Sequence, residues 1–76
     1  MPRFFRSISG KSMVKILNKV GFVQVSQRGS HIKLKRHKLN NTDILIVPNH
    51  DELAPGTFRN ILRVAQVSLE QFDKLR

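Results

Sequence analysis

Residues 22–35 read FVQVSQRGSHIKLK, and apolar and polar side chains alternate through most of this stretch. Alternation with a period of two is typical of β-strands that have one buried and one solvent-exposed face. Gly29-Ser30 interrupts the alternation, so the stretch predicts two strands, 22–28 and 31–35, joined by a short turn. The apolar residues that we expect to face the core are Val23 and Val25 in the first strand and Ile32 and Leu34 in the second.

A helix is predicted before this hairpin. Ser9 is suited to cap its N-terminus, apolar residues then recur three and four positions apart, and Gly21 is suited to end it. Residues 1–8 show no clear period, and we expect Phe4, Phe5 and Ile8 to cover the edge of the core.

The remaining elements follow the hairpin. Residues 43–47 predict a third strand, which Pro48 ends because proline has no backbone N–H for the ladder. A second amphipathic helix begins at Pro55, and Ser68 with Gln71 forms a capping-box pattern before a short last helix. The predicted fold class is therefore α+β, in the order α-β-β-β-α with a short extra C-terminal helix.

The size of the chain limits its organisation. With 76 residues and no cysteine, we expect a single domain over residues 1–76 without disulfides. The longest wholly apolar run, residues 44–47, is much shorter than a membrane span or the apolar part of a signal peptide. We expect a soluble, cytoplasmic protein.

The basic residues are concentrated in the first part of the chain. Fourteen Lys and Arg stand against five acidic residues, and ten of the basic residues lie before Asp43, where there is no acidic residue. Such a region attracts polyanions, which makes nucleic acid the favoured partner. An anionic membrane surface is the alternative, but it requires cations beside large apolar residues on one helix, whereas here they are spread over a helix and a hairpin.

His31 is the main candidate for chemistry. It directly follows the Gly-Ser turn and shares the polar face of its predicted strand with Lys33 and Lys35. Histidine exchanges protons near neutral pH, and a histidine beside cations is suited to accept a proton. This combination suits metal-free RNA cleavage, in which the imidazole deprotonates a ribose 2′-OH and the cations stabilise the transition state. The residues alone leave open that His31 is one more polar side chain on a solvated strand.

The other two histidines give weaker signals. His37 lies in a polar turn, and His50 precedes Asp51 and Glu52, which is compatible with a local ion pair or with a general acid. The three histidines lack the close pairing of zinc motifs. The sequence predicts no metal site and no cofactor.

Several motifs of the chain resemble the HicA toxin family. These motifs are Ser9-Gly10-Lys11, Gly21-Phe22-Val23, residues 27–31, Val47-Pro48, residues 53–62 and residues 65–68. The Gly-Ser-His triplet at 29–31 and Pro-Gly-Thr at 55–57 make the match specific. The resemblance covers nearly the whole chain from Ser9 to Phe72.

The resemblance implies a fold like that of the double-stranded RNA-binding domain and the activity of a bacterial mRNA interferase, an endoribonuclease paired with a HicB-type antitoxin. It also implies that His31 is the catalytic residue. We expect the RNA backbone to be bound by Arg28, Ser30, Lys33, Lys35 and Arg36, together with Lys11 and Lys15 of the first helix. The alternative is a non-catalytic RNA-binding module that uses the same face.

Overall fold

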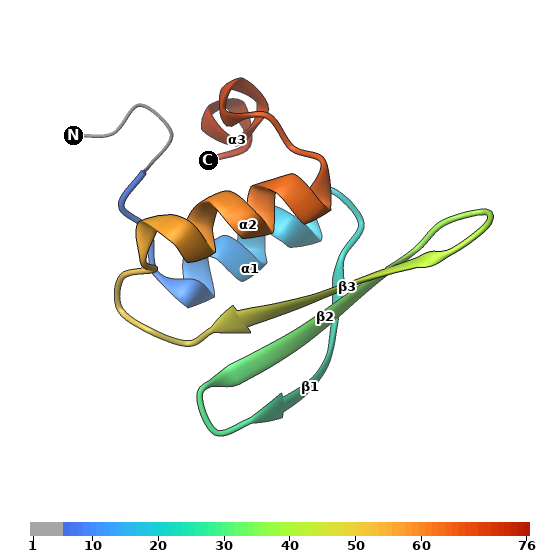
Figure 1. Ribbon diagram of the computed structural model, residues 1–76, viewed down its shortest axis with the longest axis horizontal. Helices are drawn as coiled ribbons and strands as arrows, with labels where there is room; N and C mark the ends of the chain where they lie inside the picture. The colour runs from blue at the N-terminus through green and yellow to red at the C-terminus, as the bar shows by residue number, and fades with distance from the viewer. Residues whose placement is uncertain (1–5) are drawn as a thin grey trace.

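The structure is a computed structural model that describes residues 6–76, so the expectation for Phe4 and Phe5 lies outside the described residues. Helix α1 spans Gly10–Asn18, strands β1, β2 and β3 span Val23–Arg28, His31–His37 and Thr42–Pro48, and helices α2 and α3 span Pro55–Ala65 and Leu69–Leu75. This order confirms the predicted α-β-β-β-α layout with its extra C-terminal helix (Figure 1).

The three strands form one antiparallel sheet in the order β1-β2-β3. Both long helices lie on the same side of this sheet (Figure 1), where α2 packs on β3 and α1 packs on β3 and β1. We call the other side of the sheet the open face. The side chains of Ile32 and Leu34 point to the helices and are buried, as the alternation predicted.

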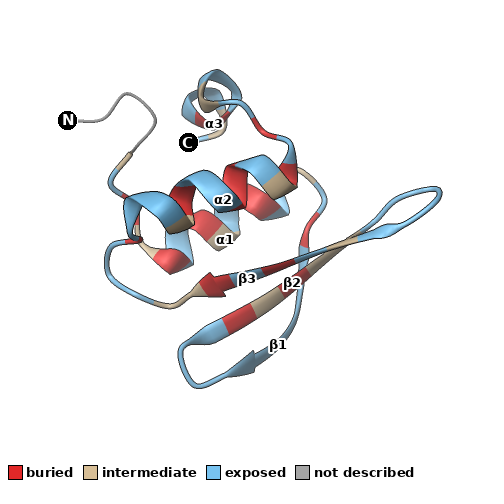
Figure 2. Ribbon diagram, viewed as in Figure 1, coloured by how far each residue is buried: buried red, intermediate tan, exposed pale blue. Residues whose placement is uncertain are grey.

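The core lies between the helices and the sheet. Its largest fully buried side chains are Phe22, Phe58, Phe72, Met13 and Leu17, and Ile8 joins the same cluster. The rings of Phe58 and Phe72 meet edge to face with centroids 5.1 Å apart, which fixes α3 against α2. No polar side chain is buried among residues 6–76. Every polar side chain of these residues is therefore at least partly exposed, and Figure 2 shows that much of the sheet and of the helix surfaces is exposed or intermediate.

The helix caps follow the sequence signals. The Ser9 hydroxyl accepts a hydrogen bond of 3.1 Å from the Ser12 backbone N–H and begins α1. At α3, Ser68 and Gln71 exchange both bonds of a capping box. No helix within residues 6–76 has the length and apolar character needed to cross a bilayer.

The predicted burial of the valines in β1 is wrong. All six residues of β1 are exposed, Val23 at 62% and Val25 at 50%. A β-bulge shifts the register between Gln24 and Ser26, and the extra residue interrupts the alternation. Because residues that pair directly across a ladder share a face, the pairing of Val23 with Lys35 places this valine on the open face.

Candidate functional site

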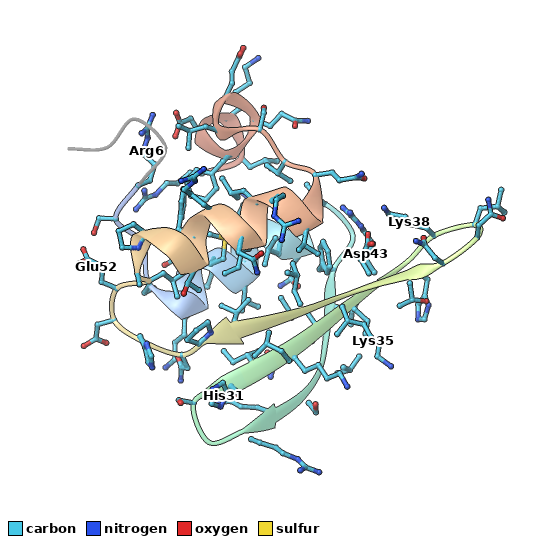
Figure 3. All side chains as sticks on the ribbon, viewed as in Figure 1. Arg6, His31, Lys35, Lys38, Asp43 and Glu52 are labelled. Carbon is cyan, nitrogen blue, oxygen red and sulfur yellow. The ribbon has the colours of Figure 1, made fainter. Side chains whose placement is uncertain are left out.

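The middle strand of the sheet carries a row of basic side chains on the open face. His31, Lys33 and Lys35 alternate with buried residues along β2, so they lie on the open face at intervals of about 7 Å. Figure 3 shows His31 at the start of β2 near the β1–β2 turn and Lys35 further along the strand. The exposed His31 pairs with Arg28 on one side and with Pro48 on the other.

A pocket of ≈ 420 Å³ surrounds His31 on the open face. Its lining side chains are Ser26, Arg28, His31, Lys33 and Ile46. The bulge in β1 is what brings Ser26 and Arg28 to this side, opposite Lys33 and His31 respectively. Directly opposed residues in a sheet have Cβ atoms about 5 Å apart, so the Arg28 guanidinium can reach a group that is bound to the imidazole.

The cations of this pocket have no acidic partner within residues 6–76. The ion pairs of this part of the chain use Arg6, Arg36, Lys38 and Lys74 as their basic members. None of them involves Arg28, Lys33 or Lys35, and none involves Lys11 or Lys15 of α1. The His31 ring likewise forms no hydrogen bond to another residue of this part of the chain. The open face therefore carries uncompensated positive charge, which attracts a polyanion.

Arg36 differs from the other predicted RNA-binding residues. Its guanidinium forms an ion pair of 2.8 Å with Asp43, donates to the carbonyl oxygens of Val20 and Ala65, and lies 4.4 Å from the centroid of the Phe22 ring. The Arg36 guanidinium and then Lys38 hold the pKa of the Asp43 carboxyl below its ordinary value. These contacts occupy Arg36 on the helix side of the sheet, away from the His31 pocket.

The remaining candidates lie around the pocket. Ser30 is in the turn beside His31, and its carbonyl oxygen accepts a 2.6 Å hydrogen bond from the Asn49 N–H. Lys11 and Lys15 are exposed on α1 and line a separate groove between α1 and β1. The structure thus joins Arg28 and Lys33 to His31 in one pocket, and it places the two helix lysines in a groove on the helix side of β1.

The other histidines lie apart from this pocket. His37 ends β2, where its Nδ1 lies 3.1 Å from the Thr42 Oγ1. His50 is exposed in the loop after β3, and its carbonyl oxygen accepts a hydrogen bond from the Gly10 N–H. Residues 6–76 contain no cluster of three or more His, Asp or Glu side chains arranged to hold a metal ion.

Exposed apolar side chains flank the basic row, a feature that the sequence interpretation missed. Val23 and Val25 lie exposed on β1, and Ile44 and Ile46 are 50% and 46% exposed on β3. The signal for β3 was present, because Ile44 and Ile46 alternate with the buried Leu45 and Val47. A different groove of ≈ 490 Å³, beside α2 and the start of α3, contains none of the predicted site residues.

Comparison with known proteins identifies the family. Neither the curated proteins nor the solved structures gave a match. One family model matches residues 10–67, and its description is a HicA toxin of a bacterial toxin–antitoxin system. The match covers most of the chain and includes both the Gly-Ser-His triplet and the Pro-Gly-Thr helix start. The chain therefore belongs to the HicA toxin family, which makes it the toxin of a toxin–antitoxin pair with a cognate antitoxin.

Proposed function

We propose that this toxin is an endoribonuclease that cleaves mRNA in the cytoplasm, with His31 as its general acid–base residue. One observation carries the proposal: an exposed imidazole without a hydrogen-bond partner in residues 6–76 shares a pocket with two cations, Arg28 and Lys33, that have no acidic partner there. Transesterification of RNA is catalysed by a general base together with positive charges that stabilise the transition state.

The proposed reaction uses the ribose 2′-OH as the nucleophile. The His31 imidazole removes the proton of this hydroxyl, and the 2′-oxygen forms a bond to the adjacent phosphorus. The bond from phosphorus to the 5′-oxygen breaks, which leaves a 2′,3′-cyclic phosphate on one fragment and, after uptake of a proton, a 5′-hydroxyl on the other. Arg28 and Lys33 stabilise the additional negative charge of the pentacoordinate transition state. These steps need neither a metal ion nor a cofactor.

The remaining basic residues bind the RNA backbone in this proposal. Lys35 extends the basic row of the open face beyond the pocket, and Ser30 offers a hydroxyl in the turn beside His31. Lys11 and Lys15 add positive charge at the adjacent edge of the sheet. Contacts of this kind position an RNA strand and supply salt-dependent affinity.

We further propose that the cognate antitoxin is of the HicB kind and covers the open face. An acidic or neutral partner would compensate the free cations, and its apolar groups would bury Ile44 and Ile46, both half exposed. Docking on α3 is the competing mode. The structure favours the open face, because Phe72 of α3 is fully buried and Leu69 and Leu75 are already packed against the core.

Substitution of His31 tests the enzymatic proposal. We expect His31→Ala to lower the rate of RNA cleavage by about 10²- to 10⁴-fold, as for the loss of one general acid–base group. Cells that express this variant should grow normally, because the growth inhibition depends on RNA cleavage. Because His31 is exposed, its truncation opens no cavity, and the variant should keep the thermal stability and RNA affinity of the parent.

His37→Ala is the matched control, since it removes an exposed imidazole from the other end of the same strand. This variant should cleave RNA at the parental rate. Parental cleavage by His31→Ala would show that His31 is not catalytic. Stable binding of unmodified RNA by the partner-free parent protein, without scission over hours, would instead favour the non-catalytic RNA-binding module.

A further inference from the structure

The groove between α1 and β1 has the composition of a small-molecule or nucleobase site. It has a volume of ≈ 410 Å³, within the range of about 300–1,000 Å³ that is usual for ligand pockets. Three carboxamide side chains line it, Gln24 and Gln27 from β1 and Asn49 from the loop directly after β3. Its apolar part comes from Val14 and Ile32.

The β-bulge gives this groove its polar side chains. Gln24 pairs with the buried Leu34 and Gln27 with the buried Ile32, so both glutamines lie on the helix side of β1. Without the bulge, residues three apart would point to opposite faces. The same bulge turns Ser26 and Arg28 to the open face, so one edge strand supplies polar groups to the groove and to the His31 pocket.

Two of the three carboxamides of the groove have no hydrogen-bond partner in the described part of the chain, and the third keeps its acceptor oxygen. Within residues 6–76, the side chains of Gln24 and Asn49 form no hydrogen bond to another residue. Gln27 uses its Nε2 for a 3.1 Å bond to the Gly29 carbonyl oxygen, which orients its Oε1 as an acceptor. A carboxamide presents a donor and an acceptor side by side and therefore matches the polar edge of a nucleobase.

The charge around the groove indicates a nucleotide rather than a neutral small molecule. Lys11 and Lys15 stand one helical turn apart at its rim and have no acidic partner in residues 6–76. The groove and the His31 pocket lie on the two sides of β1, which is one of the two edge strands of the sheet. A flexible single strand of RNA can turn round this edge, with its phosphates on the lysines.

We propose that the α1–β1 groove binds one nucleobase of the RNA strand, and that Gln24 and Asn49 select this base. The phosphate next to this nucleotide then lies at His31. The inference rests on the proposed ribonuclease function for the identity of its ligand. It assigns the two tasks of the enzyme to opposite sides of one strand: chemistry on the open face and base selection on the helix side. Sequence-specific RNA recognition of this kind reads the edges of unpaired bases.

Binding measurements test this groove separately from catalysis. Fluorescence anisotropy would give the affinities of His31→Ala protein for short oligoribonucleotides of uniform A, C or U. We expect these affinities to differ, and Gln24→Ala with Asn49→Ala in the same background should reduce the ratio of best to worst base by about tenfold, within the discrimination of one bidentate contact. Asn18→Ala, which removes an exposed amide of α1 outside the groove, should keep the ratio.

The possible results separate the two proposals. Equal affinity for the three oligonucleotides, or a uniform loss of affinity in the groove variant, would overturn base selection while leaving RNA cleavage by His31 intact. Base-dependent binding without any cleavage by the parent protein would support the groove and contradict the nuclease. In a cleaving parent, mapped cut sites should lose their base preference in the Gln24→Ala, Asn49→Ala variant.

Discussion

Substitution of Gly10 tests the packing that supports the His31 pocket from behind. Gly10 is the buried first residue of α1, and it lies against the end of β3. A Cβ atom at this position would collide with the carbonyl oxygen of Pro48 and lie 3.1 Å from the Cα of Asn49. Both obstacles are backbone atoms, so no side chain can rotate away. Because Pro48 pairs with His31, the collision would be transmitted to the site.

The expected loss of stability follows from two opposing terms. Forcing a methyl group into a packed site costs about 1–3 kcal/mol, whereas alanine gains up to about 1 kcal/mol over glycine within a helix. We expect Gly10→Ala to lower the free energy of unfolding by about 1–2 kcal/mol. For a domain of this size, that corresponds to a fall in Tm of roughly 5–15 °C.

Gly56→Ala is the matched control. Gly56 lies in the first turn of α2, and a Cβ added there meets no heavy atom within 4 Å. The control should therefore gain about 0.5–1 kcal/mol and raise the Tm by several degrees. Thermal unfolding followed by circular dichroism measures both variants. A Gly10→Ala protein at least as stable as the parent would refute the close approach of α1 to β3.

Three further predictions concern the salt dependence of RNA affinity, the Arg36–Asp43 ion pair and the docking of the antitoxin. RNA affinity should fall steeply with salt, and the slope of log K against log[salt] should be near −3 if about four cations contact a single strand. Lys33→Gln should flatten this slope by about 0.7. A slope near zero in the parent protein would contradict the electrostatic argument. The Arg36 guanidinium lowers the pKa of Asp43, so this carboxylate stabilises the fold above its unfolded pKa and the contribution is lost as the pH falls through the lowered value. Asp43→Asn should therefore show a smaller loss of stability than the parent between pH 6 and pH 2 in denaturant titrations, and equal losses would refute the ion pair. In hydrogen exchange, the antitoxin should protect the amides of residues 31–35, whereas protection confined to residues 68–76 would indicate docking on α3.

Most of the fold was predictable because its signals are local. The spacing of apolar residues in α1 and α2, the Ser9 cap and the capping box of Ser68 each act within a few residues of the chain, and each appears where it was predicted. The alternation in β2 also gave the correct inward residues. These patterns hold because the core lies on one side of the sheet only.

The structure of β1 could not be read from the sequence. Val23 and Val25 have the spacing of inward residues, but a bulge depends on how β1 pairs with β2, which no local pattern encodes. Position at the edge of the sheet adds to the difference, because α1 covers this strand only in part and leaves a groove beside it. The alternation of Val23 and Val25 is the usual pattern of a half-buried strand, but the bulge and the position of β1 at the edge of the sheet leave both side chains exposed.

The site was predictable in part because some of its residues belong to one regular strand. His31, Lys33 and Lys35 share one strand, so the period of two places them on one face. Arg28 joins them because the short turn at Gly29-Ser30 fixes the pairing of its strand with β2. Arg36 stands next to Lys35 and therefore points to the opposite face, where Asp43 of β3 pairs with it, and the simple charge pattern did not separate these two cations.

The open face combines two features that a stable isolated sheet would avoid. Adjacent cations repel one another, and exposed side chains such as Ile44 and Ile46 leave apolar surface in water. The core on the helix side supplies the stability that the open face lacks, since the buried apolar cluster of residues 6–76 lies there and contains no polar side chain. A polyanion or an acidic protein relieves the repulsion when it binds, whereas only a protein also covers the apolar residues. RNA and antitoxin should thus compete for the same cations, and the isoleucines should favour the antitoxin.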